Sequence, residues 1–315
     1  MVVLLIASGL VLLWAAFVYA PSLLLYRVIF SRRTIEPPTA LNLAGTPFAP
    51  HADEILDAKA FLAAHLPERV TVTAADGAVL AGDLYRRGEG KTVILFHGYN
   101  THPQKDVGMH AMLFYGRGYD VLVVYERAHG ESGGAHVGLG LLERFDVPLW
   151  VAKAREESPG CRIVLYGMSM GASSVAYASA SLSQNDVSAA VIDCGFTSPY
   201  EQLAHDARKR KLPARLLMPL MSLHARVFLR LELRESTSDA LAKTEIPAFF
   251  LHGEGDMTVP VGCGIKNYEA CASEKEALFV PGAAHTAALI DGGEDARKRL
   301  LAFIEKHTAD KESDK

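Results

Sequence analysis

The sequence predicts an α/β fold in which a mostly parallel β-sheet is covered by helices on both faces. Short apolar runs typical of buried strands alternate with helical stretches over the second and third hundred residues. One of these runs ends in the pentapeptide Gly-x-Ser-x-Gly at Gly167–Gly171, and small residues follow it. Residues 51–307 have the length of a single α/β domain, so we expect one such domain.

The first element is an apolar segment, residues 1–26, that contains no charged side chain. A membrane-spanning helix needs about 20 apolar residues, so this segment predicts an N-terminal transmembrane anchor. A cleaved signal peptide is the alternative, since Val18-Tyr19-Ala20 resembles a cleavage site. The absence of a basic n-region, the length of the apolar run and the position of Pro21 favour the anchor.

Arginines at 27, 32 and 33 follow the segment, whereas only the terminal amine precedes it. Because positive charge stays on the cytoplasmic side, we expect a single-pass membrane protein with its catalytic domain in the cytoplasm. Prolines at 37, 38, 47 and 50 indicate a stiff linker over residues 27–50. Residues 52–66 have apolar side chains at helical spacing and predict a short helix, packed on the domain or lying along the bilayer.

Two antiparallel strands come next, around the turn Asp76-Gly77. The serine pentapeptide further along has the order strand, sharp turn, helix, because Tyr166 ends an apolar run and Ala172-Ser173-Ser174 follow. Glycine on both sides of Ser169 permits a strained turn that lifts the serine hydroxyl to the tip of a strand. We therefore predict that Ser169 is a nucleophile.

A serine nucleophile needs a base and an acid that orients it, and after this turn the chain order is serine, acid, histidine. Asp256 follows the apolar run at residues 248–251, and His285 follows the run at 277–280. Both therefore fall at the sheet edge where α/β proteins place their chemistry. Asp193 ends another apolar run and is a competing acid, but we favour Asp256.

Backbone N–H groups of Tyr99 and Met170 are the predicted oxyanion hole. In this architecture one donor comes from the loop after an early strand, here His97-Gly98-Tyr99, and the other from the residue after the nucleophile. His97 is expected to pack behind this loop rather than act as a base. His129 and Ser132 are expected to order the loop after residues 121–124.

Together these motifs resemble the α/β-hydrolase superfamily, and within it the membrane-anchored YqkD-like and Bem46-like serine hydrolases. The resemblance rests on His97-Gly98-Tyr99, residues 127–132, the Ser169 pentapeptide, residues 193–198, the Gly-Glu-Gly-Asp run ending at Asp256, and Gly282 to His285. It covers roughly residues 70–304. It implies an α/β-hydrolase fold with a helical cap and a Ser-His-Asp triad.

The stretch after Asp193 is too long for a simple crossover, and we expect residues 196–244 to form the cap, broken at Pro213 and Pro219. Residues 201–235 carry eight basic and four acidic side chains, whereas the whole chain has a net charge of −4. Leu216, Leu217, Met221 and Phe228 are candidate substrate-binding residues for an acyl group. The alternative is a solvated charged face over an ordinary buried apolar face.

Several classes of function are disfavoured. The acidic chain and the absence of aromatic interleaving in the basic cluster argue against nucleic-acid binding. Four cysteines show no metal-ligand spacing, and no phosphate-binding or dinucleotide motif is present, so we predict no metal and no cofactor. Residues 308–315 read as a charged tail.

The sequence thus predicts a membrane-anchored carboxylesterase-like serine hydrolase. Its expected partners are a small-molecule or lipid ester and membrane lipid. A thioesterase or lipase acting on membrane acyl groups, and a serine aminopeptidase, are alternatives. A non-catalytic scaffold is disfavoured because each triad residue is present in order.

Overall fold

The computed structural model describes residues 6, 8, 9, 15–46 and 48–309. Eight strands form one sheet. They are β1 (Glu68–Thr73), β2 (Val79–Tyr85), β3 (Lys91–Phe96), β4 (Asp120–Val124), β5 (Arg162–Met168), β6 (Ala189–Asp193), β7 (Ala248–Gly253) and β8 (Lys275–Val280).

The strand order in the sheet is β1-β2-β4-β3-β5-β6-β7-β8. Strand β2 is antiparallel to its neighbours β1 and β4, and the other pairs are parallel. The predicted hairpin at Asp76-Gly77 is therefore confirmed, as is the mostly parallel sheet. Because β5, β6 and β7 are parallel neighbours, the loops after them emerge at one edge, which brings Ser169, Asp193 and Asp256 to the same side of the sheet.

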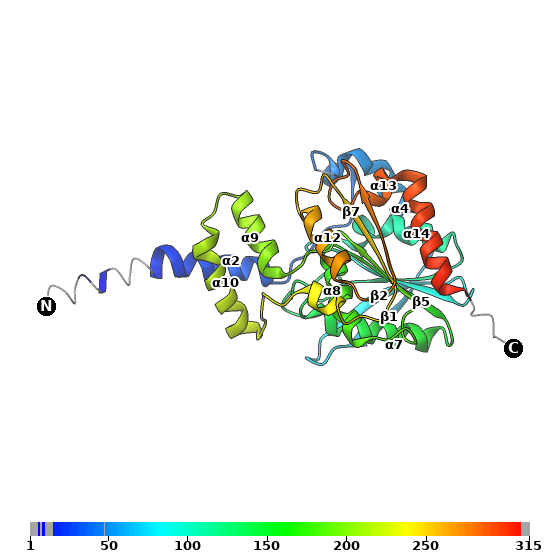
Figure 1. The fold of residues 1–315 in the computed structure, drawn as a ribbon, viewed down its shortest axis with the longest axis horizontal. Helices are drawn as coiled ribbons and strands as arrows, with labels where there is room; N and C mark the ends of the chain where they lie inside the picture. The colour runs from blue at the N-terminus through cyan, green and yellow to red at the C-terminus, as the bar shows by residue number, and fades with distance from the viewer. Residues whose placement is uncertain (1–5, 7, 10–14, 47, 310–315) are drawn as a thin grey trace.

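Helices cover both faces of the sheet, with α4 and α14 on one side and α7 on the other (Figure 1). One apolar core contains side chains of α4 (Ala52–Ala64), α6 (Gly108–Tyr115), α13 (Ala288–Asp291) and α14 (Gly293–Thr308). The other contains those of α7 (Val147–Glu157), α8 (Met170–Ala178), α11 (Thr237–Leu241) and α12 (Val261–Ala270). Alternate residues of β3 point to opposite cores, since Val93 and Leu95 join the first and Ile94 and Phe96 the second.

The N-terminal region begins with a π-helical turn, Ala15–Tyr19, that runs into α2 (Ala20–Phe30). Within the described part of the chain, no helix combines the length and apolar character that a membrane span requires. Residues 1–5, 7 and 10–14 of the predicted anchor lie outside the described residues. Helix α2 continues past residue 26, the expected end of the anchor, to Phe30, whose side chain is buried in a cluster with residues of α10.

Residues 31–51 differ from a uniformly extended linker. Ser31 and Arg33 form isolated bridges with His136 and His129, and α3 (Ala40–Leu43) follows, capped by Thr39. The helix predicted after the linker is confirmed as α4. It packs against α6 through buried side chains that include Ile55 and Leu62, which settles its position on the domain rather than along a bilayer.

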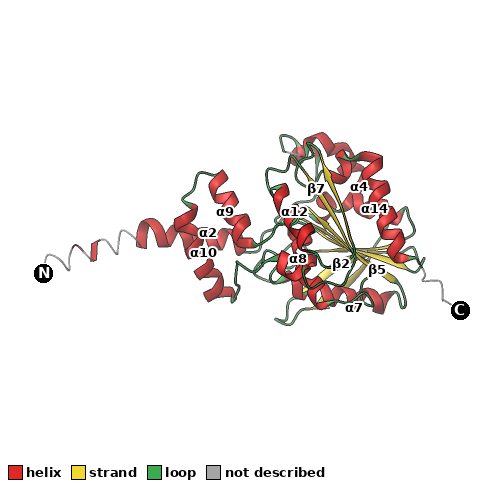
Figure 2. Cartoon of the chain, in the orientation of Figure 1, coloured by secondary structure: helices red, strands yellow, loops and turns green. Residues whose placement is uncertain are grey.

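The insertion after β6 contains α9 (Pro199–Lys209) and α10 (Ala214–Leu229). These two helices and α2 lie together at one end of the molecule, away from most of the sheet (Figure 2). Pro213 separates α9 from α10 as predicted, but Pro219 lies inside α10, so the second predicted break is wrong. A proline near the start of a helix removes few hydrogen bonds, and packing of α10 on α2 offsets the loss.

Candidate active site

Ser169 lies between β5 and α8 in a conformation that side chains rarely adopt, with φ 55° and ψ −113°. Glycine is required at positions 167 and 171, because backbone atoms of other residues lie too close to leave space for a Cβ. A Cβ on Gly167 would lie 2.4 Å from the Gly171 carbonyl oxygen, and one on Gly171 would lie 2.3 Å from that of Phe96. The sequence therefore folds into the predicted sharp turn because neither neighbouring position has space for a side chain.

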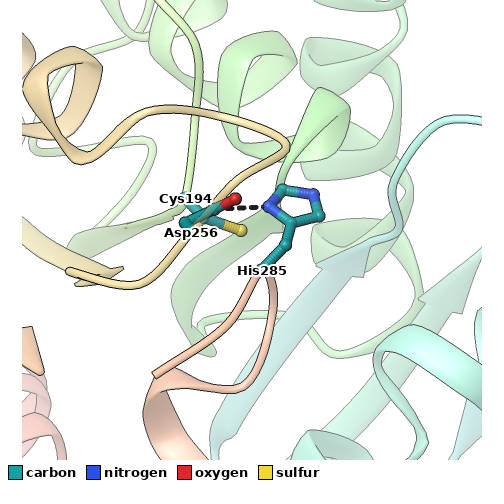
Figure 3. Close-up of side chains that lie close together, drawn as sticks. All are labelled: Cys194, Asp256 and His285. Atoms are coloured by element: carbon teal, nitrogen blue, oxygen red, sulfur yellow. Dashed lines mark hydrogen bonds and ion pairs between the residues drawn. The ribbon is translucent and has the colours of Figure 1, made fainter. Parts of the chain in front are cut away.

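The structure brings Ser169, His285 and Asp256 together from three separate loops. His285 Nε2 lies 3.0 Å from Ser169 Oγ. On the other side of the ring, His285 Nδ1 lies 2.6 Å from Asp256 Oδ2, the contact drawn as a dashed line in Figure 3. A carboxylate only accepts, so Nδ1 carries the ring proton and Nε2 is left to accept from the serine hydroxyl. The histidine tautomer is thus the one that can take a proton from Ser169.

Asp256 is held as a carboxylate in a buried position. Burial alone raises the pKa of this carboxyl, but hydrogen bonds from His252, His285 and the Val259 N–H hold it well below its usual range. Asp256 Oδ1 accepts from the N–H groups of Thr258 and Val259 at 2.8 and 2.9 Å. These two bonds fix the carboxylate plane and leave Oδ2 directed at His285.

The competing acid, Asp193, is engaged elsewhere. Its Oδ2 accepts the Tyr166 hydroxyl at 2.7 Å, and burial raises its pKa to about 6. Asp193 Oδ1 is buried without a hydrogen-bond partner. The geometry therefore favours Asp256 over Asp193 as the acid that orients His285.

The loop after β3 lies against the nucleophile. A Cβ on Gly98 would be 3.3 Å from the Ser169 Cβ, and Tyr99 is the next residue. Met170 is the first residue of α8, where a backbone N–H has no partner within the helix. The two N–H groups predicted as an oxyanion hole thus belong to segments that flank Ser169.

Sequence reasoning missed Asp106, which shapes this loop from α5 (Pro103–Asp106). Its Oδ2 accepts from Gly98 N–H at 2.9 Å, and its Oδ1 accepts from the Thr101 hydroxyl at 2.9 Å. Burial raises the pKa of this carboxyl. Nothing in the local pattern marks Asp106, because its partners lie in a loop whose path only the folded chain defines.

Histidines 97 and 129 have the structural positions predicted for them. His97 Nε2 accepts from Glu126 N–H at 3.0 Å, and His129 Nε2 accepts from Asn100 N–H at 3.0 Å. Ser132 accepts from Ala81 N–H at 2.8 Å. Burial lowers the pKa of both imidazoles, so both stay neutral and cross-link the loops after β3 and β4.

Cys194 is an unexpected neighbour of the triad, with a positive φ of 47° directly after β6. Ligand atoms of Cys194, Asp256 and His285 all lie within 4.8 Å of one another (Figure 3). Burial raises the pKa of this thiol well above its usual value, and the charges of Asp193 and Asp256 raise it further. The thiol is therefore protonated, and an ion bound by these three groups would compete with the hydrogen bond between His285 and Asp256.

The four predicted substrate-binding residues do not share one environment. Met221 is buried in an apolar cluster with Tyr26 of α2, and Phe228 has its ring centroid 5.5 Å from that of Tyr26. Leu217 is also buried, whereas Leu216 is exposed. Met221 and Phe228 thus contact the N-terminal helix, which the sequence reasoning left out because it treated that helix as separate from the cap.

Comparison with known proteins places this geometry in context. The sequence profile described as serine aminopeptidase, S33, matches residues 89–239. An uncharacterized protein of Bacillus subtilis, YqkD, is 27% identical over 219 residues, covering 68% of this chain and 71% of that protein.

Solved structures have the same fold. The Pyrococcus furiosus esterase Pf2001 is 22% identical, with a TM-score of 0.66 over 88% of this chain and 100% of the esterase. The Pyrococcus horikoshii acylaminoacyl peptidase is 17% identical, with a TM-score of 0.58 over 78% of this chain and 42% of the peptidase. The predicted resemblance is confirmed as a similarity: the chain matches a serine-hydrolase family profile and the YqkD protein, and it shares the α/β-hydrolase fold of the solved esterases.

Proposed function

We propose that this serine hydrolase is membrane-anchored and cleaves carboxylic esters through Ser169, His285 and Asp256. The observation that carries the proposal is the continuous chain of hydrogen bonds from Ser169 Oγ through the imidazole to the buried Asp256 carboxylate. Asp256 is held as the carboxylate that orients the imidazole.

In the first half of the reaction, Ser169 Oγ attacks the ester carbonyl carbon while His285 Nε2 takes the hydroxyl proton. The negative charge that develops on the carbonyl oxygen is stabilised by the Tyr99 and Met170 N–H groups and by the N-terminus of α8. One such donor can be worth about 3 kcal/mol in the transition state. The C–O bond then breaks, and the imidazolium gives its proton to the leaving alcohol.

In the second half, a water molecule attacks the acyl-serine. His285 accepts a proton from this water and returns it to Ser169 Oγ when the carboxylic acid leaves. Asp256 keeps Nδ1 protonated in both halves and stabilises the imidazolium. The reaction needs only residues of this chain and water.

We favour ester cleavage because the matched esterase is covered over its whole length, whereas the matched peptidase is covered over less than half of its length. Aminopeptidase activity is the second candidate, since the matching family profile is that of a serine aminopeptidase. Thioesters and lipid esters of the membrane remain alternative substrates for the same triad.

The full chain in detergent micelles provides the test, because residues 29–33 pack on the catalytic body. We expect turnover of p-nitrophenyl esters from acetate to palmitate, labelling by an organophosphonate, and loss of both in Ser169→Ala with unchanged circular dichroism. Cleavage of an amino-acid p-nitroanilide alone would favour the peptidase. A folded chain that is inert to all substrates and to the phosphonate would indicate a non-catalytic scaffold.

The anchor and its orientation are proposed from the charge-free residues 1–26 and the arginines that follow them. We expect the full chain to remain in the membrane fraction after carbonate extraction. In spheroplasts, protease should leave the catalytic domain intact because it lies on the cytoplasmic side. Release by carbonate would contradict the anchor, and digestion of the domain in intact spheroplasts would contradict its orientation.

A further inference from the structure

Helix α10 has two apolar faces, of which only one is used inside the molecule. The inner face carries Met218, Met221 and Ala225, which are buried in the cluster that includes Tyr26 and Phe30 of α2. A helix that serves only to cover a core has polar residues on its opposite face. The opposite face of α10 is apolar instead.

The outer face of α10 consists of Leu216, Leu223 and Val227, which recur at intervals of seven and four residues and so form one stripe. Their exposed fractions are 47%, 49% and 62%. Helix α2 adds two further exposed side chains, Leu24 and Val28, one turn apart. An exposed apolar surface of this kind marks an interaction site rather than an ordinary solvent-facing helix.

Basic side chains surround this stripe. Arg215 and Arg226 are eleven residues apart, which places both along one edge of the outer face, and both are exposed. Four consecutive exposed basic residues, at positions 208–211, end α9 and lead into α10, and Arg27 is exposed on α2. Arg226 also forms a hydrogen bond with Glu232. The other basic side chains of this set are exposed and all carry positive charge.

We propose that the outer face, defined as Leu216, Leu223 and Val227 with the surrounding arginines and lysines, docks into an anionic lipid bilayer surface. In-plane helices of membrane-bound proteins combine an apolar stripe, which enters the boundary between headgroups and acyl chains, with basic residues that contact anionic headgroups. Helix α2 lies beside α10 at one end of the molecule (Figure 1), and the sequence before α2 carries no charged side chain, which supports a membrane at that end.

A second copy of the chain is a poorer occupant for this face. A symmetric dimer would bring the same surface of both copies together and would therefore place the two basic sets opposite each other. Like charges across an interface oppose association, whereas an anionic bilayer complements them. The charge pattern thus favours lipid over self-association.

Docking would place the catalytic site on the membrane side of the body. The cap follows the carboxyl end of β6, and Ser169 follows the carboxyl end of the neighbouring strand β5, so both lie at one edge of the sheet. The docking itself does not depend on the proposed ester hydrolysis, and the two are tested separately.

The test uses the full chain with Trp14, which lies in the proposed anchor, replaced by phenylalanine, and with a tryptophan probe, Val227→Trp. The vesicles are of phosphatidylcholine and phosphatidylglycerol, with or without brominated acyl chains. Bromine quenches tryptophan at short range, so we expect emission from the probe to fall in brominated vesicles. The matched control is Leu66→Trp, an equally apolar position that is 93% exposed and precedes β1 at the opposite edge of the sheet. The control probe should keep its emission.

Two further comparisons decide the role of charge and the identity of the partner. In vesicles of phosphatidylcholine alone, and in the variant carrying Lys211→Glu and Arg215→Glu, quenching of the Val227→Trp probe should be lost or greatly reduced. Equal quenching of both probes, no quenching at position 227, or no flotation of the chain with anionic vesicles would overturn the proposal. A change in the probe's emission with protein concentration in the absence of lipid would indicate self-association and overturn it as well.

Turnover of a water-soluble ester, measured on the same samples, separates the two proposals. Loss of quenching with intact turnover refutes docking alone. Quenching in a chain that never turns over any ester leaves docking supported and refutes the hydrolase activity. Circular dichroism shows in either case that the catalytic body is folded.

Discussion

Replacing Asp256 with asparagine puts a hydrogen-bond donor where an acceptor faced His285, and it leaves the volume of the side chain almost unchanged. Asp256 Oδ1 accepts two backbone N–H groups, so the amide oxygen of the variant must occupy that position. The amide NH2 then takes the place of Oδ2, 2.6 Å from His285 Nδ1. A donor now faces Nδ1, so Nδ1 becomes an acceptor and the ring proton moves to Nε2.

A protonated Nε2 cannot accept the hydroxyl proton of Ser169, from which it is separated by 3.0 Å. Where the same substitution has been made in a Ser-His-Asp triad, the loss in kcat is about 10⁴-fold, which corresponds to about 5.5 kcal/mol of activation free energy. We expect a loss of that order for Asp256→Asn, with little change in KM because Asp256 does not contact the substrate.

The assay is ester turnover by the full chain, with the concentration of folded sites fixed by circular dichroism and a thermal melt. Asp193→Asn is the matched control, since Asp193 bonds the Tyr166 hydroxyl rather than His285. We expect the control to lose less than tenfold in kcat. Turnover by Asp256→Asn within tenfold of the native chain, or an equal loss in Asp193→Asn, would refute the assignment of Asp256.

Three other predictions follow from the geometry. Asp193 is fully buried, and its pKa is raised to about 6, so the folded chain binds the Asp193 proton more tightly than the unfolded chain does. The free energy of unfolding should therefore fall as the pH rises from about 4 through 6. Urea unfolding of the native chain should show a drop of about 3 kcal/mol over this window that Asp193→Asn lacks, and identical pH profiles would contradict the buried charge. Tyr99→Phe removes the 2.8 Å hydrogen bond to the Ile29 carbonyl and should lower the stability of the full chain by about 1 kcal/mol in a thermal melt, so an unchanged melting temperature would count against this contact. Zn²⁺ should inhibit ester turnover reversibly by binding His285 and Cys194. Inhibition should be stronger at higher pH, because Zn²⁺ must displace the proton of the Cys194 thiol. Equal inhibition of the Cys194→Ser variant would exclude this site.

The catalytic core could be predicted from the sequence because each signal is local. Gly167 and Gly171 flank Ser169 for steric reasons that hold wherever this turn occurs. The apolar runs that became β5, β7 and β8 place Ser169, Asp256 and His285 after strands. In a parallel sheet the carboxyl ends of strands share one edge, so all three residues are expected at that edge, and the loops after β7 and β8 then bring Asp256 and His285 to Ser169.

The cap and the N-terminal region were predicted less well because their structure depends on contacts between distant segments. Pro219 was expected to end a helix, but α10 continues through it while its inner face packs against α2. Met221 and Phe228 were assigned to substrate because nothing in the sequence indicates that α2 is their neighbour. Their predicted contact with substrate stays a prediction.

The sequence by itself determined the class of chemistry, the strand–turn–helix that carries Ser169, and the order of the partners that could serve it. These features depend on backbone sterics and on residue types at fixed spacing. Only the tertiary structure placed Asp256 rather than Asp193 against His285, placed Asp106 beside Gly98, and brought Cys194 next to Asp256 and His285. Those relationships depend on the directions of side chains at the ends of neighbouring strands, which no local pattern specifies. The sequence presents α2 as an isolated apolar segment. In the tertiary structure α2 packs against the cap, because its buried side chains share an apolar cluster with those of α10.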